Sequence, residues 1–141
     1  MTYTYAISGD DYGSAGAASS DIKKKLRQLG LPSPLIKRTA IAMYEAEINM
    51  VIHGGGGTTR VDIGPDCIEM EFHDQGPGIA DIELAMTEGW STASDAAREL
   101  GFGAGMGLPN IRRNVDELSI ESVPGQGTTV RMSQHLGGRE D

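Results

Sequence analysis

Three polar side chains are spaced so that they can act together on one face of a helix. In the stretch YEAEINMVIH (residues 44–53), Glu45, Asn49 and His53 follow one another at intervals of four residues, which stacks them on one side of an α-helix. A carboxylate there can orient a water or a hydroxyl, and an amide oxygen one turn later can ligate Mg²⁺. A solvated polar stripe has the same spacing, so this motif alone leaves both interpretations open. Glu47 falls on another face, where we expect it at the surface.

A second acid stands at the end of an alternating segment. In CIEMEFHDQGPG (residues 67–78), period-two alternation puts Asp74 on the same inward face as Ile68, Met70 and Phe72. A carboxylate aimed into an apolar layer needs hydrogen-bond donors, and an exocyclic amino group such as that of adenine would serve. The alternative is that Asp74 caps the tight turn that follows it. Thr128, in the last alternating segment, has the parity to face the same pocket and support Asp74 directly or through water.

The third motif is the stretch GFGAGMGLPN (residues 101–110), in which every second residue from 101 to 107 is glycine. It is no Walker A loop, because the chain contains no Gly-Lys pair, and it does not fit the dinucleotide pattern G-x-G-x-x-G. What remains is a G-x-G-x-G run leading into a helix near Pro109. Main-chain N–H groups at a helix N-terminus form an anion site without lysine. A glycine hinge is the competing interpretation.

The elements that must position these groups alternate between helical and extended patterns. We expect strands at 2–8, 58–63, 67–74, 118–123 and 128–133, and helices at 15–29, from Ser33 to His53, near 79–86 and at about 108–117. This mixture predicts an α+β fold, a two-layer α/β sandwich.

Composition limits the possible functions. We expect the 141 residues to form one domain, with a core at about 15–133 and a disordered tail at 134–141. A net charge of −8 argues against nucleic acid as a partner, and one cysteine excludes a disulfide framework. No apolar run approaches the roughly 20 residues of a membrane span. We therefore expect a cytoplasmic protein that does not bind a membrane.

Taken in order, these motifs resemble the GHKL superfamily of ATP-binding proteins. Glu45 and Asn49 resemble its N box, 74–78 its first glycine box, 103–108 its second, and the stretch GQGTT (residues 125–129) its closing element. The resemblance implies the Bergerat fold, a mixed and largely antiparallel sheet with helices on one face. It also implies ATP and Mg²⁺ as cofactors.

The resemblance assigns a role to each matching residue. Glu45 would be catalytic, orienting or deprotonating an attacking hydroxyl, and Asn49 would hold Mg²⁺. Asp74 would accept from the adenine amino group, and residues 87–100 would form a lid. The nucleotide-binding residues would be Asn49, His53, Asp74, Gly76, Gly78, Ile79, Thr92, Gly103, Ala104, Gly105, Met106, Gly107, Leu108 and Thr128.

Within the superfamily, the stretch GLPNIRRNVDELSIESVPGQGTTV (residues 107–130) is especially similar to the anti-sigma-factor kinases and the stressosome switch-kinase. Histidine kinases usually carry Asn where Glu45 stands. The resemblance therefore implies a serine/threonine protein kinase that phosphorylates a small partner of the STAS type (an anti-sigma-factor antagonist). The alternative is a nucleotide-dependent binding module that sequesters a sigma factor or a phosphatase without turnover. Self-association into a homodimer is left open.

Overall fold

In the part of the chain that the structure describes, five strands form a single sheet in the order β1-β2-β3-β5-β4. The structure is a computed structural model, and it describes residues 1–9, 15–52, 56–74, 76, 107–123 and 125–136. The strands are β1 (Thr2–Ser8), β2 (Gly56–Ile63), β3 (Cys67–Asp74), β4 (Glu117–Val123) and β5 (Gly127–His135). Every pairing among these strands is antiparallel, so the sheet shows no mixed character within the described residues.

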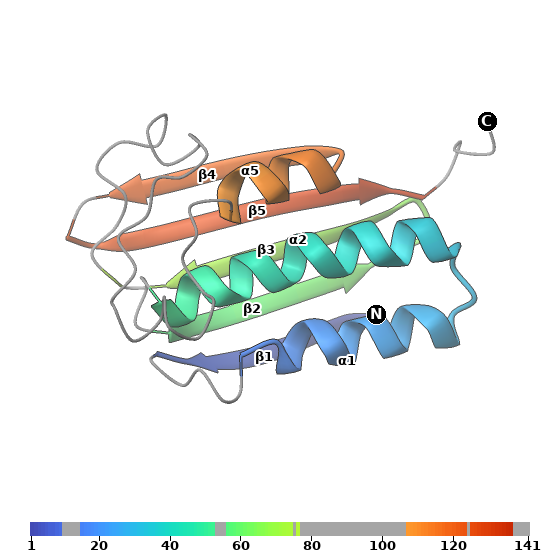
Figure 1. Cartoon of the computed structure of the whole chain (residues 1–141), viewed down its shortest axis with the longest axis horizontal. Helices are drawn as coiled ribbons and strands as arrows, with labels where there is room; N and C mark the ends of the chain where they lie inside the picture. The colour runs from blue at the N-terminus through green and yellow to red at the C-terminus, as the bar shows by residue number, and fades with distance from the viewer. Residues whose placement is uncertain (10–14, 53–55, 75, 77–106, 124, 137–141) are drawn as a thin grey trace.

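Within the described residues, three helices cover one face of this sheet (Figure 1): α1 (Ala17–Gln28), α2 (Ser33–Ile52) and α5 (Gly107–Asn114). The second lies across the centre, with α1 beside it over β1 and α5 on its other side over β5 and β4. This arrangement confirms the α+β two-layer sandwich with helices on one face. No helix in the described part of the chain is long and apolar enough to span a membrane.

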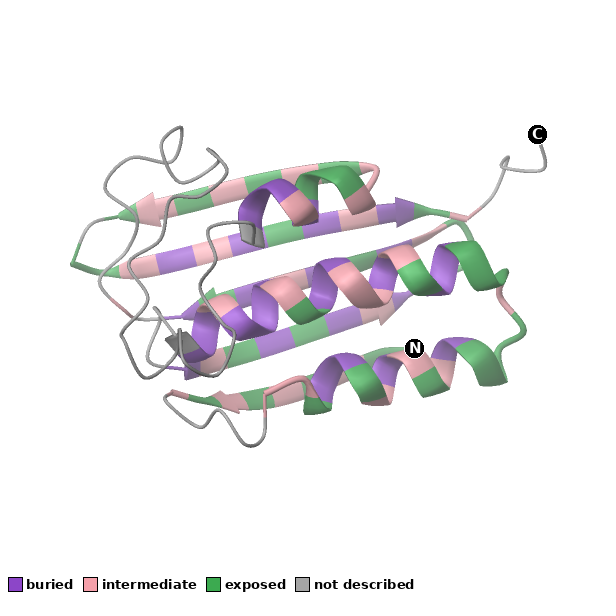
Figure 2. Ribbon diagram, in the orientation of Figure 1, coloured by how far each residue is buried: buried purple, intermediate pink, exposed green. Residues whose placement is uncertain are grey.

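The core lies between the helices and the sheet, because alternate residues of each strand point toward the helices. Figure 2 shows buried positions alternating with exposed ones along the central strands. The largest apolar side chains with essentially no exposed surface are Ile22, Leu26, Met43, Val51, Val61, Ile68, Met70, Phe72 and Ile111.

The expected elements at 2–8 and 67–74 have the bounds that alternation predicted, whereas several others differ. Strand β2 begins two residues before residue 58, within the glycine run. Helix α2 begins at Ser33, as expected, and there the amide of Ile36 donates to the carbonyl of Pro32. The expected helix near 79–86 lies outside the described residues.

Helix α5 and strand β5 differ most clearly from the sequence expectation. Helix α5 ends at Asn114 rather than at residue 117, because buried Gln134 bonds the chain there. Its Nε2 donates to the carbonyl of Asn114 (2.6 Å), and its Oε1 accepts from the amide of Asp116 (3.0 Å). Strand β5 correspondingly runs to His135, so residues 134 and 135 belong to the sheet and not to a disordered tail.

Candidate functional site

The polar groups singled out in the sequence belong to elements that end at the same edge of the sandwich. In Figure 1, the C-terminal end of α2, the end of β3 and the start of β5 lie together, and α5 begins toward the same side. Sheet register fixes the strand part of this cluster, because Asp74 pairs with Gly57 on one side and with Thr128 on the other. Met50 connects α2 to the sheet, with its sulfur 3.7 Å from the Thr59 hydroxyl.

Glu45 lies half-buried on α2 and is held by a residue of α5. The side-chain Nδ2 of Asn110 donates a hydrogen bond to Oε2 of Glu45 at 3.1 Å. Burial raises the pKa of the Glu45 carboxyl, and the hydrogen bond from Asn110 opposes part of that rise. A carboxylate whose pKa is moved toward neutrality, and which is fixed in orientation, has the properties of a general base.

Asn49 follows Glu45 by one helical turn and is also half-buried. Its side chain therefore falls on the same side of α2. The amide oxygen is a hard donor of the kind that Mg²⁺ accepts. Within the described residues, no group of three or more His, Cys, Asp or Glu side chains could hold a metal ion.

Asp74 lies at the end of β3 with 9% of its surface exposed. Its Oδ1 accepts two main-chain hydrogen bonds, from the amide of Gly76 at 3.0 Å and from the amide of Thr128 at 3.2 Å. The first bond is the turn cap that the sequence left as an alternative, so Asp74 does cap the turn. The capping engages Oδ1, and a carboxylate has a second oxygen with which to accept from a ligand.

Thr128 supports Asp74, but not through its side chain. The bond comes from its main-chain N–H, whereas its hydroxyl lies 2.9 Å from the hydroxyl of Ser122. The threonine itself is buried. The expected proximity of these two residues is confirmed, and the donor is the backbone.

The glycine-rich segment is described only from Gly107, the first residue of α5. Leu108 packs into the core with 7% of its surface exposed. The structure thus places Glu45, Asn49, Asp74, Gly76, Gly107, Leu108 and Thr128. The remaining expected site residues lie outside the described part of the chain: His53, Gly78, Ile79, Thr92, Gly103, Ala104, Gly105 and Met106.

Glu47 was expected at the surface, and this expectation is wrong. Only 1% of it is exposed, and its carboxylate accepts three main-chain hydrogen bonds at the start of α1. These come from the amides of Gly16 (3.0 Å), Ala18 (3.2 Å) and Ser19 (3.0 Å). The carboxylate therefore caps the positive end of the α1 dipole and ties α1 to α2.

A sequence signal for this burial was available. Glu47 stands four residues after Met43 and three before Met50, both of which are buried, so it shares their core-facing side of α2. Asn110 was also missed as a site residue. Its signal is its place three residues after Gly107, in the first turn of a helix that must pack on α2.

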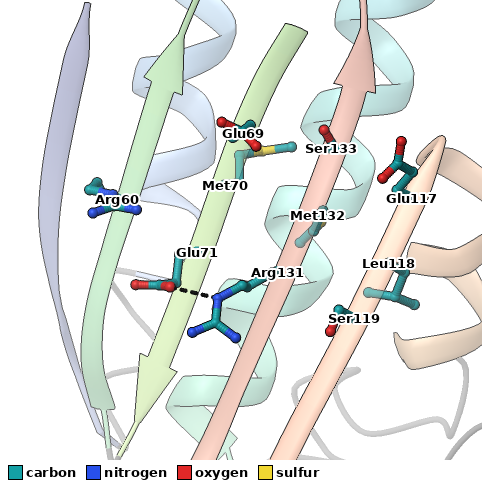
Figure 3. Close-up of a pocket in the computed structure, with 10 residues that line it drawn as sticks. All are labelled: Arg60, Glu69, Met70, Glu71, Glu117, Leu118, Ser119, Arg131, Met132 and Ser133. Carbon is teal, nitrogen blue, oxygen red and sulfur yellow. Dashed lines mark hydrogen bonds and ion pairs between the residues drawn. The ribbon is translucent and has the colours of Figure 1, made fainter.

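A separate hollow of about 270 Å³ lies on the open face of the sheet. Figure 3 shows its lining from β2, β3, β5 and β4, with the helices behind the sheet. Arg131 bonds Glu71 at 2.8 Å and also contacts Glu121, while Arg60 pairs with Asp62 at 3.1 Å. The side chains of Glu45 and Asp74 belong to the helix side, so this hollow is not part of their site.

Likeness to solved structures first shows the class of fold to which the protein belongs. The chain aligns over 96% of its length, with a TM-score of 0.66 and 15% identity, to a structure described as the RsbU and RsbW domains of Rv1364c from Mycobacterium tuberculosis. The alignment covers 32% of that longer chain. A second match, the mycobacterial sensor histidine kinase MprB, has a TM-score of 0.54 at 16% identity and covers 97% of that chain. At such identities the likeness shows the fold alone, and that fold is shared by these two proteins.

The family follows from the sequence. A model of the histidine kinase-like ATPase domain matches residues 10–134, and the chain belongs to that family. It is 40% identical over 101 residues to an anti-sigma F factor of Thermoanaerobacter sp. (strain X514), which spans 68% of this chain and 67% of the relative. It is 33% identical over 114 residues to the serine/threonine-protein kinase RsbT of Bacillus subtilis (strain 168), spanning 78% and 80%. Membership of this family implies that the domain binds ATP.

Proposed function

We propose that this protein is a Mg²⁺·ATP-dependent serine/threonine kinase of the anti-sigma-factor type, acting on a small STAS-type protein. The observation that carries the proposal is Glu45, half-buried, hydrogen-bonded by Asn110 and raised in pKa on the helix that also bears Asn49. A protein that only binds nucleotide has no need of a positioned base. The relative named as a serine/threonine-protein kinase supports the same reading.

The proposed site divides the work among the described residues. Oδ2 of Asp74 accepts a hydrogen bond from the amino group of adenine, while its Oδ1 keeps its hydrogen bonds from the main chain. Asn49 offers its amide oxygen to Mg²⁺, which supplies charge neutralisation to the phosphates when bound. The N–H groups at the start of α5, which follows the glycine-rich segment, face the phosphate charge.

Glu45 acts on the partner rather than on the nucleotide. Its carboxylate orients the serine hydroxyl and takes its proton as the oxygen attacks the γ-phosphorus. The new O–P bond forms as the bond from the γ-phosphorus to the bridging oxygen breaks, and ADP leaves. Because phosphoryl transfer depends mainly on positioning and charge stabilisation, a fixed carboxylate is the contribution that α2 can make.

The test separates binding from transfer. Glu45→Gln keeps the shape and removes the base, so we expect nearly normal Mg²⁺·ATP affinity and a fall of about 10²–10⁴-fold in phosphate incorporation into the partner. Asn49→Ala should weaken nucleotide binding and transfer together. Glu69→Gln, an exposed acid on β3, is the matched control and should alter neither.

The second candidate is a binding module, favoured by the relatives named anti-sigma F factor. In that case nucleotide controls the capture of a partner, and no serine is ever labelled. Pull-down of the partner with and without ATP, followed by phosphosite mapping, distinguishes the two functions. Nucleotide-dependent capture without a phosphosite would replace the kinase by the binding module.

A further inference from the structure

Asn110 connects two elements that the proposed reaction needs to hold in register. It lies half-buried in α5, three residues after Gly107. Its partner Glu45 is 65 residues away in the chain, on α2, and the two side chains meet at 3.1 Å. The contact thus joins the helix that follows the glycine-rich segment to the carboxylate proposed as the base.

The orientation of the Asn110 amide is set from both ends. Its NH₂ group faces an oxygen of Glu45, which in the ionised carboxylate is an acceptor and not a donor. Its Oδ1 faces Nη2 of Arg113 at 3.4 Å. Donor meets acceptor at each end, and a flipped amide would place oxygen against oxygen at Glu45. The main-chain oxygen of Asn110 accepts from Nδ2 of Asn114 at 2.8 Å. This bond involves only the main chain of Asn110, so the side-chain amide is the group that connects α5 to α2.

We propose that Asn110 is a positioning residue for Glu45, fixing Oε2 so that Oε1 is presented to the partner hydroxyl. This inference rests on the proposed function. A free glutamate side chain samples several rotamers, and the hydrogen bond selects one of them. Because the donor belongs to α5, Glu45 and α5 keep the same position relative to each other when nucleotide binds.

The same contact sets how easily Glu45 becomes protonated. Tyr44 on α2 interacts electrostatically with Glu45, and Arg113 on α5 donates a hydrogen bond to Oδ1 of Asn110. Burial raises the pKa of Glu45, and the Asn110 hydrogen bond lowers it. Removing that donor should raise the pKa further, so a larger fraction of the base is protonated at a given pH.

Kinetics provide the first arm of the test. In Asn110→Ala we expect phosphate transfer to fall by about 10–100-fold, since a small misplacement of a reacting group has effects of that size. Mg²⁺·ATP affinity should stay within about twofold, and the acid limb of the pH–rate profile should move to higher pH. Asn110→Asp, which has the same shape and brings a second carboxylate to Glu45, should move that limb further.

Direct titration of Glu45 provides the second arm and needs no activity. The side-chain carboxyl resonances of ¹³C-labelled glutamates are followed against pH, with Glu45 assigned by its loss in Glu45→Gln. We expect the Glu45 midpoint to rise in Asn110→Ala and to stay unchanged in Asn114→Ala. The latter removes a neighbouring amide of α5 and so controls for loosening of the helix.

Each result bears on a different statement. An unchanged Glu45 midpoint in Asn110→Ala, or an equal shift in Asn114→Ala, overturns the positioning role whether or not the protein is a kinase. A raised midpoint with full transfer activity also overturns it, because the hydrogen bond would then not serve the reaction. Absence of transfer in the unchanged protein removes the catalytic part together with the proposed function, while the titration still decides whether Asn110 holds Glu45.

Discussion

Two glutamates separated by one residue on α2 have opposite environments. Glu47 is enclosed and receives three main-chain N–H groups, which compensate its charge. Glu45 is less buried, receives one amide donor and has a raised pKa. The acid with three main-chain donors has a structural role, whereas Glu45, with one donor and a raised pKa, has the properties of a proton acceptor. Helix phase alone therefore separates a cap from a candidate base.

The capping role predicts a large loss of stability in Glu47→Gln. The amide has a single acceptor oxygen, and its NH₂ group would face backbone donors, leaving at least one buried N–H without an acceptor. We expect a decrease of about 1–3 kcal/mol in the free energy of unfolding. Urea denaturation measures this loss, and Glu69→Gln should change the same quantity by no more than about 0.5 kcal/mol. Equal stability of the two variants would contradict the cap.

For Glu45, the raised pKa predicts that replacement by Gln increases stability, and that the increase depends on pH. Since its pKa is higher in the folded than in the unfolded chain, its contribution to stability is full at pH below the unfolded value and is lost as pH rises through the folded value. Glu45→Gln should therefore unfold at a higher temperature than the unchanged protein at pH 7–8. The difference should shrink as the pH falls to about 4, near the ordinary pKa of glutamate. A thermal melt series across pH checks this, and a constant difference would refute it.

At the scale of elements, the close approach of β2 to β3 positions Asp74. A Cβ added to Gly57 would lie 2.1 Å from the carbonyl oxygen of His73 and 2.9 Å from Cα of Asp74. It would also lie 2.8 Å from the terminal methyl of Met50. Only glycine fits here, because backbone atoms on the neighbouring strand cannot move aside without carrying Asp74 with them.

This crowding predicts that Gly57→Ala reduces both stability and ATP affinity. We expect about 1–3 kcal/mol of destabilisation from overpacking, together with weaker binding because Asp74 is displaced. Gly125→Ala is the matched variant, since Gly125 has φ +81° with open space around its missing Cβ, and it should cost roughly 1–2 kcal/mol of backbone strain. Calorimetric ATP titration should show a loss for the first variant only, and equal affinities would disconnect Gly57 from the site.

Local pattern was sufficient for elements whose reasons are local. The alternation of Tyr3, Tyr5 and Ile7 predicted β1, and that of Ile68, Met70 and Phe72 predicted β3. The end of α5 was not predictable in this way, because it depends on Gln134 from another strand. The Asn110–Glu45 contact was missed for the same reason, since periodicity carries no information on which distant side chain meets which.

At the scale of the whole molecule, the motifs predicted more than the periodicity did. The sandwich and its family are confirmed, and the described half of the site falls at one edge. The roles of the glycine-rich segment and of residues 87–100 stay predictions, because they lie outside the described residues. Sequence could order the motifs but could not show that Asp74 is already bonded to the backbone through one oxygen.

Nucleotide binding should appear as a stability change of the entire domain. A ligand present at 100 times its Kd stabilises the folded state by about 2.7 kcal/mol. Mg²⁺·ATP should therefore raise the melting temperature by several degrees. In Asp74→Asn we expect at least tenfold weaker ATP binding, about 1.4 kcal/mol, and a correspondingly smaller shift at the same concentration. The retained Oδ1 should keep the turn, so the variant should melt normally without ATP. A smaller ATP-induced rise in its melting temperature would support the assignment, and an undiminished rise would place the adenine site elsewhere.

The position of β1 at the edge of the sheet has a consequence for biosynthesis. Thr2 contacts Asp62, and the two are separated by 60 residues, because both long helices intervene between β1 and its partner β2. At the usual elongation speed of about 5–20 residues per second, β1 waits roughly 3–12 s after its own synthesis before β2 exists. During that interval the apolar side of β1, with Tyr3, Tyr5 and Ile7, has no sheet to join. Until β2 has been made, this segment can pair with strand edges of other chains, so β1 is exposed to mispairing during synthesis.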